Sequence, residues 1–416
     1  MAPASGRAVA QLASAVVPGP IDVETERSAT PGCRGIAHLN NAGAALATQA
    51  TLDAVVGHLR REAAQGGYEA AASVADRLVA LRSSAARLLG ADDGDVVVTG
   101  SDTQSWTKAL WGFAHGGGIA RHQRILADRL AHDSHYLGLL QVCELTGATV
   151  EVVPSMADGT VDLDALAAAL DPGGVALVAV THIGTHRGLV NPIEEAGAAS
   201  RRAGVPFFLD ACQSVGQLQV DVGAIGCQVA TATGRKWLRG PRGTGLLYVE
   251  RSFAERLRPP GISWSSALWY DADHFELRPG AERFLEFEVP VAAFIGFGVA
   301  IDHALSLGLD SIAACVGALG ERLRGTLAGL DGVHVHDGGQ RRSGIVTFTM
   351  DAATPARVKQ AALATGINVS VSESHFARLD MAAPNPEAVV RASPHYYNTD
   401  EELDRLVDVV ATLAGD

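Results

Sequence analysis

A repeated alternation of short apolar runs and longer amphipathic segments, from about residue 50 to residue 249, constrains the fold more than any other feature. Mostly apolar runs such as 96–99, 175–180 and 207–209 predict buried strands, and the segments between them predict helices. Strands that alternate with helices form a mostly parallel sheet covered on both faces, so we expect an α/β fold. Such folds keep their chemistry at the carboxyl ends of the strands.

The same patterns give approximate bounds for the elements. We predict helices at 51–64, 74–89, from about 103, at 136–146, 162–170, after Asn191-Pro192 and at 291–307, and strands at 96–99, 125–127, 149–153, 175–180, 207–209 and 229–232. Residues 259–282 are expected to form a long irregular segment that contacts substrate or a second subunit. Past Gly308 we predict a helix, strands at 333–336 and 344–350, a helix at 355–365, a strand at 367–371 and a helix at 400–414.

The regular alternation of strands and helices ends after residue 249, and this change predicts how the chain divides into domains. We expect an N-terminal arm over residues 1–35, flexible or clasping a second subunit, a large domain over 36–307 and a small α+β domain over 308–416. With 416 residues and 47% hydrophobic composition, the chain is long enough to bury a large core.

Charge and cysteine usage narrow the classes of partner. With 33 basic and 46 acidic residues the net charge is −13, and no dense Lys/Arg run is present, so we expect a small-molecule partner rather than nucleic acid or a membrane. The five cysteines are scattered and form no CxxC pair, which predicts no metal site, no disulfide framework and a reducing cytoplasm. Gln11 and Ser14 interrupt the first apolar run, so we do not expect an export signal.

The stretch 208–249 carries the strongest chemical signal. Asp210 ends one predicted strand, and Lys236 lies just past the next one. Isolated Asp and Lys residues are mostly exposed surface groups, so the pair alone proves little. Brought together at strand ends, however, they suit pyridoxal phosphate: the lysine forms a Schiff base, and the acid keeps the pyridine nitrogen protonated.

As a whole, this stretch resembles the class V aminotransferase and cysteine desulfurase superfamily, fold type I of the pyridoxal-phosphate enzymes. The resemblance implies a large domain with a mostly parallel seven-stranded sheet, a small α+β C-terminal domain, and a homodimer with active sites at the subunit interface. It implies that Lys236 is the Schiff-base lysine, Asp210 the partner of the pyridine nitrogen and Gln213 a donor to the ring hydroxyl oxygen. Thr233 and Arg235 fall where the family binds the cofactor phosphate.

A second anion site is expected where strand 96–99 enters a helix. There Ser101, Asp102 and Thr103 offer amides and hydroxyls at a helix N-terminus, although a plain helix cap would look the same. The resemblance places these residues near the phosphate. Because a carboxylate repels a phosphate, we expect Asp102 to offer only its backbone amide.

Three further positions are assigned by the resemblance. It favours His135 as the imidazole that stacks on the pyridine ring and shuttles a proton, with His132 as the alternative. His182 stands where many relatives carry an Asn that contacts cofactor or substrate, and Asn41 lies in the entry segment that lines the substrate pocket.

The segment 390–399 resembles the superfamily's substrate-arginine motif. It implies that Arg391 holds the substrate carboxylate, which a planar guanidinium does in bidentate fashion. The alternative is an arginine in a structural ion pair.

Two departures from the superfamily define a branch. No cysteine occurs between Val369 and Val390, where a desulfurase carries its nucleophile, and residues 283–289 lack the Gly-Thr pair that many relatives donate to the partner's phosphate site. The chain thus resembles the branch of isopenicillin epimerase-like and ergothioneine-pathway carbon–sulfur lyase-like proteins. This implies an external aldimine with an amino acid, α-proton removal by Lys236 and β-elimination; transamination is the runner-up and epimerisation or racemisation a third outcome. A non-enzymatic sensor is disfavoured, because no appended DNA-binding region is apparent.

Overall fold

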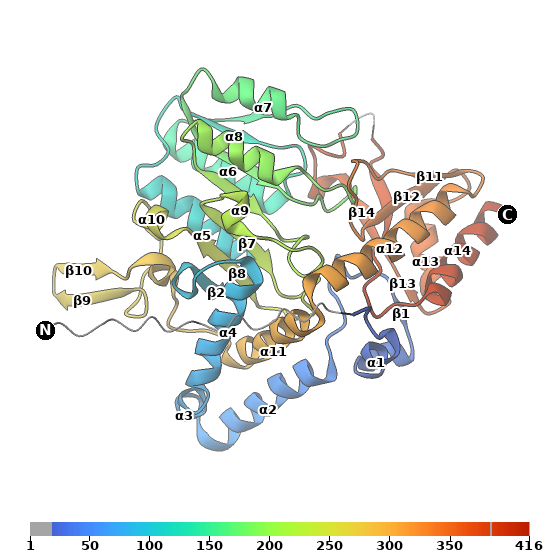
Figure 1. The fold of residues 1–416 in the computed structure, drawn as a ribbon, viewed down its shortest axis with the longest axis horizontal. Coiled ribbons are helices and arrows are strands. Elements are labelled where there is room, and N and C mark those ends of the chain that lie inside the picture. Colours follow the sequence, from blue (N-terminus) through green and yellow to red (C-terminus); the bar gives the residue numbers. More distant parts are fainter. Residues whose placement is uncertain (1–18, 383–384, 416) are drawn as a thin grey trace, which may run out of the picture.

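The computed structural model describes residues 19–382 and 385–415, and its largest element is a seven-stranded sheet (Figure 1). The strand order is β2-β8-β7-β6-β5-β3-β4, and only β8 runs antiparallel to its neighbours. The strands are β2 (Val96–Thr99), β3 (Arg124–Ala127), β4 (Thr149–Val152), β5 (Val175–Thr181), β6 (Phe207–Asp210), β7 (Val229–Thr233) and β8 (Gly245–Val249). The predicted α/β fold with a mostly parallel sheet is confirmed.

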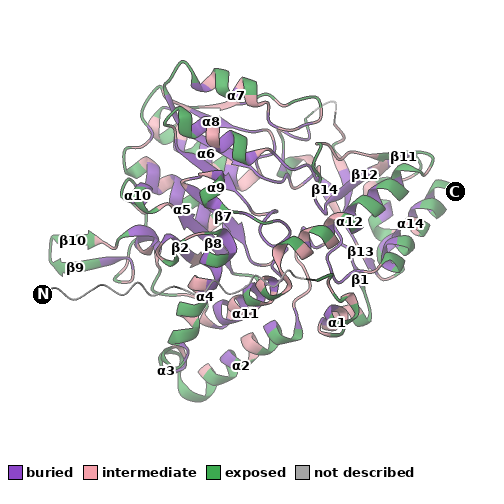
Figure 2. Cartoon of the chain, in the orientation of Figure 1, coloured by how far each residue is buried: buried purple, intermediate pink, exposed green. Residues whose placement is uncertain are grey.

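Alternate strand residues build two cores, one on each face of this sheet. Phe207 and Leu209 pack into one core with α4, α7, α8 and α11, whereas Phe208 packs into the other with α5, α6 and α10. Figure 2 shows the central strands buried and the outer helix faces exposed. The helices of this part are α2 (Gln49–Gln65), α3 (Gly67–Ala72), α4 (Ala75–Leu89), α5 (Asp102–His115), α6 (Asp133–Thr146), α7 (Leu163–Leu170), α8 (Ile193–Arg202), α9 (Val222–Ile225), α10 (Arg251–Ala254) and α11 (Val291–Leu307).

The C-terminal part is a four-stranded antiparallel sheet covered by helices. Its strand order is β11-β12-β15-β14. The elements are α12 (Leu309–Ala328), β11 (Val333–Val335), β12 (Val346–Met350), α13 (Pro355–Ala364), β14 (Ser370–Glu373), β15 (Ala388–Ala392) and α14 (Asp400–Gly415). An early segment also joins this unit, because β1 (Ala37–His38) pairs with β13 (Ile367–Asn368), and Leu39 packs into the same core. Thus the first residues of the predicted large domain lie against the small one.

Some local predictions were wrong. The segment 259–282 contains an antiparallel hairpin of β9 (Ala267–Asp271) and β10 (His274–Leu277), which is largely exposed in Figure 2. Its side chains face solvent on both sides, so the alternation that marks a half-buried strand is missing. The strand predicted at 367–371 is two short strands, β13 and β14, and β15 was not predicted.

Among the described residues, no single helix has both the length and the apolar character needed to cross a bilayer. Helices α11 and α12 reach that length and apolar character only together, and the chain bends by 83° between them.

The N-terminal arm is folded onto the body over its described part. Helix α1 (Val23–Ser28) buries Glu26, which lies 3.2 Å from the Arg239 guanidinium and 2.8 Å from Nε2 of His303. Arg27 donates to the Tyr397 carbonyl and pairs with Glu402. The expectation of a flexible arm is therefore wrong for residues 19–35, whereas contact with a second subunit stays a prediction, and residues 1–18 lie outside the described residues.

This anchoring predicts a stability effect. We expect Glu26→Ala to lower the free energy of unfolding by about 3–5 kcal/mol, because it leaves the buried guanidinium of Arg239 without its carboxylate. Urea unfolding followed by tryptophan fluorescence measures the change. The matched control is Glu24→Ala on the exposed side of the same helix, expected to change stability by no more than about 0.5 kcal/mol. Equal stability of the two variants would show that the arm contributes little.

Candidate active site

Two adjoining cavities open at the carboxyl edge of the large sheet. The first, called the inner cavity, is lined by Ser101, Asp102, Thr103, Leu130, His132, Ser134, Thr181, Ile183, Thr185, Asp210, Cys212, Gln213, Thr233, Arg235 and Lys236. The second, called the outer cavity, is lined by Ala42, Gly43, His132, Thr185, His186, Arg235, Lys236, Ser370, Val371, Ser372, Phe376 and Arg391. Lys236 borders both, so its amine can serve a group in either.

Lys236 and Asp210 come from neighbouring strands. Asp210 is the last residue of β6, and Lys236 follows β7, so parallel pairing brings them to the same edge. The Lys236 amine has Sγ of Cys212 at 3.3 Å as a neighbour. Burial raises the pKa of the Cys212 thiol well above its usual range, so this sulfur is a neutral neighbour of the amine.

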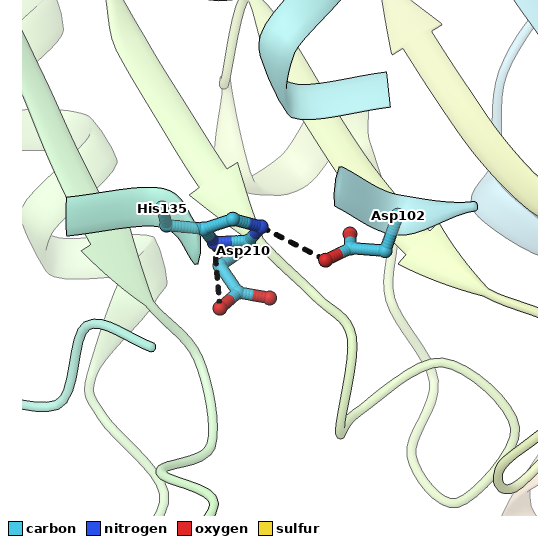
Figure 3. A group of neighbouring side chains, drawn as sticks. All are labelled: Asp102, His135 and Asp210. Carbon is cyan, nitrogen blue, oxygen red and sulfur yellow. Dashed lines mark hydrogen bonds and ion pairs between the residues drawn. The ribbon is translucent and has the colours of Figure 1, made fainter. Parts of the chain in front are cut away.

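His135 lies behind Asp210 rather than on a cavity wall. Its Nδ1 is 3.0 Å from the Asp210 carboxylate, its Nε2 2.8 Å from the Asp102 carboxylate, and its ring stacks on Trp106 at 4.3 Å (Figure 3). This corrects one expectation, because His135 is not placed to stack on a ring in the inner cavity. Asp102 directs its carboxylate to His135, and the expectation that it offers a phosphate only its backbone amide stays a prediction. The ligand atoms of the three side chains lie within 4.8 Å of one another, so the absence of a metal site stays a prediction.

His132, the alternative, lines both cavities. It caps the N-terminus of α6, where its Nδ1 lies near the Ser134 amide and 2.6 Å from Oδ1 of Asp133. Burial, with the nearby Lys236 charge, lowers the pKa of His132. The imidazole is therefore mainly neutral at pH 7, in a position to cover the face of a planar ligand.

Gln213 and Thr185 are connected in the wall of the inner cavity. Nε2 of Gln213 donates to Oγ1 of Thr185 at 2.7 Å, and Oε1 accepts from the indole of Trp237 at 2.9 Å. Of the residues that follow β5, the sequence prediction named His182 as a substrate contact and not Thr185. His182 is buried and lines neither cavity, and neither of its ring nitrogens has a hydrogen-bond partner among the described residues. Burial lowers its pKa to about 3.

Arg391 lies on β15 at the wall of the outer cavity and is buried. It donates to the Thr185 carbonyl at 3.0 Å and to Oδ1 of Asn40 at 3.5 Å. Within residues 19–382 and 385–415, no carboxylate forms an ion pair with it. Burial, with the charge of Arg235, lowers its pKa to about 10, so it remains charged and is available to an anion.

Asn41 is not placed at a cavity. Its amide donates to the carbonyls of His38 and Ser393, and its oxygen accepts from the Tyr397 hydroxyl. These bonds hold the entry segment together, and the next residues, Ala42 and Gly43, line the outer cavity instead. The expectation of substrate contact through Asn41 is corrected accordingly.

Ser101 and Thr103 open α5 beside Thr233 and Arg235 in the inner cavity. Amides at the start of a fourteen-residue helix, two threonines and a guanidinium form a suitable anion site. The segment 283–289 packs against the same helix, since Glu286 accepts from Gln104 and pairs with Lys108 at 2.9 Å.

A buried lysine and an acid on adjacent strand ends, next to an anion site, define the chain as an enzyme of the pyridoxal-phosphate class. The residues present fit this cofactor: the Lys236 amine for its aldehyde, the Asp210 carboxylate for its ring nitrogen and the start of α5 for its phosphate. The chain belongs to the class V aminotransferase family, whose profile matches residues 37–406. The family's cofactor, pyridoxal 5′-phosphate, is the one that the sequence predicts.

Comparison with individual proteins agrees with this family. The chain is 33% identical over 393 residues to a probable hercynylcysteine sulfoxide lyase of Mycobacterium tuberculosis, covering 93% of each protein. It is 28% identical to a probable cysteine desulfurase of Methanothermobacter thermautotrophicus, covering 84% of this chain and 87% of the relative. A solved cysteine desulfurase from Thermococcus onnurineus shares the fold, with a TM-score of 0.87 at 24% identity over 94% of this chain and 98% of that one.

Proposed function

We propose that this chain is a pyridoxal-phosphate-dependent lyase that removes the β-substituent from cysteine S-conjugates or their sulfoxides. The observation that carries the proposal is the outer cavity, where the Lys236 amine and the Arg391 guanidinium border the same space and no carboxylate of the described residues pairs with Arg391. Similarity to a hercynylcysteine sulfoxide lyase supports the choice of elimination, as does the absence of a cysteine between residues 369 and 390.

Each side chain has a role in this proposal. Arg391 holds the substrate carboxylate, which fixes the Cα–H bond near the Lys236 amine. Lys236 holds the cofactor at rest and takes the α-proton during turnover. His132, in place of His135, covers one face of the cofactor ring, and Gln213 with Thr185 contacts its hydroxyl side.

The cofactor, when bound, withdraws electrons from Cα, and the chain's own groups manage protons and charge. The Cα–H and Cβ–S bonds of the substrate break, the proton goes to Lys236, and sulfur leaves with the bonding electrons. The remaining enamine hydrolyses to pyruvate and ammonia.

A product assay tests whether the enzyme catalyses elimination, transamination or epimerisation. We expect the holoenzyme to release pyruvate and ammonia in equal amounts from an S-alkyl-cysteine sulfoxide or thioether, with no protein persulfide. Alanine substitutions of Cys33, Cys143, Cys227 and Cys315, none of which lines either cavity, should leave turnover largely intact. Interconversion of the aldehyde and amine forms of the cofactor that depends on a keto acid, without elimination products, would favour an aminotransferase, and inversion at Cα an epimerase.

We also propose a cytoplasmic homodimer. The exposed side chains of Trp264 and Phe287, whose rings lie 5.3 Å apart, and of Trp269 and Tyr270 on β9 support a subunit contact near α5. Sedimentation equilibrium should give about twice the chain mass of 43.1 kDa, and a single-chain mass would contradict the proposal.

A further inference from the structure

The carboxylate of Asp102 meets the buried imidazole of His135, although Asp102 also lines the inner cavity. Asp102 stands at the first position of α5, but its Oδ2 meets Nε2 of His135 at 2.8 Å. His135 and Asp210 are also buried, with 2% and 4% of their surface exposed. Among the residues that the structure describes, His135 is the one basic side chain that forms an ion pair with either carboxylate. Two buried acids therefore share one imidazole.

This arrangement favours a charged imidazole. Burial alone lowers the pKa of His135, but the charges of Asp210 and Asp102, with their hydrogen bonds, outweigh it and raise the pKa to about 10. Burial likewise opposes the charge on Asp102, yet His135 holds the pKa of this carboxyl well below its usual range. The start of α5 stabilises the same negative charge. The imidazole of His135 is thus held between two carboxylates.

The same contacts fix the orientation of Asp210. Its Oδ1 accepts from the Cys212 amide at 2.9 Å, and its Oδ2 faces Nδ1 of His135 at 3.0 Å. His135 is itself held by the Asp102 bond and by the stack on Trp106, whose planes differ by 16°. Figure 3 shows the imidazole between the two acids. Asp210 is the one of the two that ends a strand at the cavity edge, where a ring nitrogen would meet it.

We propose that Asp102 and His135 are a positioning pair for Asp210: Asp102 balances the charge on His135, so that the charge of Asp210 remains available to a protonated ring nitrogen in the inner cavity. This inference rests on the proposed function. Without Asp102, the charge of His135 would be balanced by Asp210 alone. The protonated ring nitrogen would then compete with the imidazolium for the Asp210 carboxylate. We expect the pair to strengthen the binding of the ring nitrogen and to leave the binding of the phosphate and the aldehyde unchanged.

The test compares two cofactors on the cofactor-free protein. Dissociation constants are measured for pyridoxal phosphate and for its deaza analogue, in which a CH group replaces the ring nitrogen. We expect the wild type to prefer pyridoxal phosphate and Asp102→Asn to reduce this preference by about tenfold, the size expected for one charged hydrogen bond. The matched control is Asp95→Asn, a buried acid whose carboxylate lies 3.9 Å from Arg251 and does not contact His135; its preference should match the wild type.

Each result decides between explanations. An equal loss of affinity for both cofactors in Asp102→Asn would show a merely structural role and overturn the inference. If the wild type forms no imine with pyridoxal phosphate, the proposed function itself fails. A second measurement does not depend on cofactor affinity. Nitrogen-15 NMR of histidine-labelled wild-type protein should show His135 doubly protonated at pH 7. A neutral His135 ring at this pH would also overturn the inference.

Discussion

Lys236→Ala should lose the visible absorption of the bound cofactor and almost all turnover, by at least about a thousandfold, because a covalent catalyst cannot be replaced by binding alone. The sequence contains three lysines, Lys108, Lys236 and Lys359, and only Lys236 lines either cavity. The chain therefore offers no second amine at the site. Absorption spectra before and after borohydride reduction, with kcat on the best substrate, measure both losses.

A lysine on the surface provides the matched control. Lys359 is exposed on α13, so Lys359→Ala should keep the spectrum and the turnover of the wild type. An unchanged visible band in Lys236→Ala would refute the assignment of this lysine. Because Lys236 has Cys212 as its neighbour at 3.3 Å, Cys212→Ala tests the packing separately and should keep the imine.

The sequence predicted the parts of the site that depend on strand ends. Asp210 and Lys236 each follow a short apolar run, and adjacent parallel strands bring such positions together whatever the exact bounds of the strands. The same reasoning predicted a helix that begins near residue 103, and α5 begins at Asp102 with Ser101 as its N-cap. These positions follow from topology, which the alternation of strands and helices determines.

The sequence could not resolve choices within one turn. His132 and His135 are three residues apart, and the first caps α6 while the second already lies inside it. A shift of one position in the helix start rotates each side chain by about 100°, so spacing alone does not show which ring reaches the cavity. His182 and Thr185 present the same difficulty, because both follow β5 within a few residues. Spacing alone did not show that the histidine is buried and that the threonine contacts Arg391.

Contacts between segments that are distant in the sequence could not be predicted from it either. The pairing of β1 with β13 joins residues about 330 positions apart, and no local pattern marks such a partner. The Asp102–His135 pair spans two helices and depends on the rotation of both, which periodicity does not specify.

Arg391→Lys should lower kcat/KM by roughly 10- to 1000-fold, as expected for the loss of about 1.4–4 kcal/mol of bidentate carboxylate binding. Affinity for pyridoxal phosphate should be retained. The neighbouring Arg187 pairs with Asp380 at 3.4 Å and lies outside both cavities, so Arg187→Lys is the control expected to keep most activity. An equal loss of cofactor affinity in Arg391→Lys would place this residue in a structural role.

Stability provides an independent criterion for Arg391. An arginine in a buried ion pair stabilises its partner, so its removal costs about 3–5 kcal/mol. Arg391 instead is buried near Arg235, and the oxygens of Thr185 and Asn40 that accept its hydrogen bonds are neutral. Replacement by an apolar residue of similar length, Arg391→Met, should therefore leave the stability of the cofactor-free protein unchanged or raise it, while abolishing carboxylate binding. Since no acid among the described residues compensates this charge, such a result would support our proposal that Arg391 binds an anion during turnover.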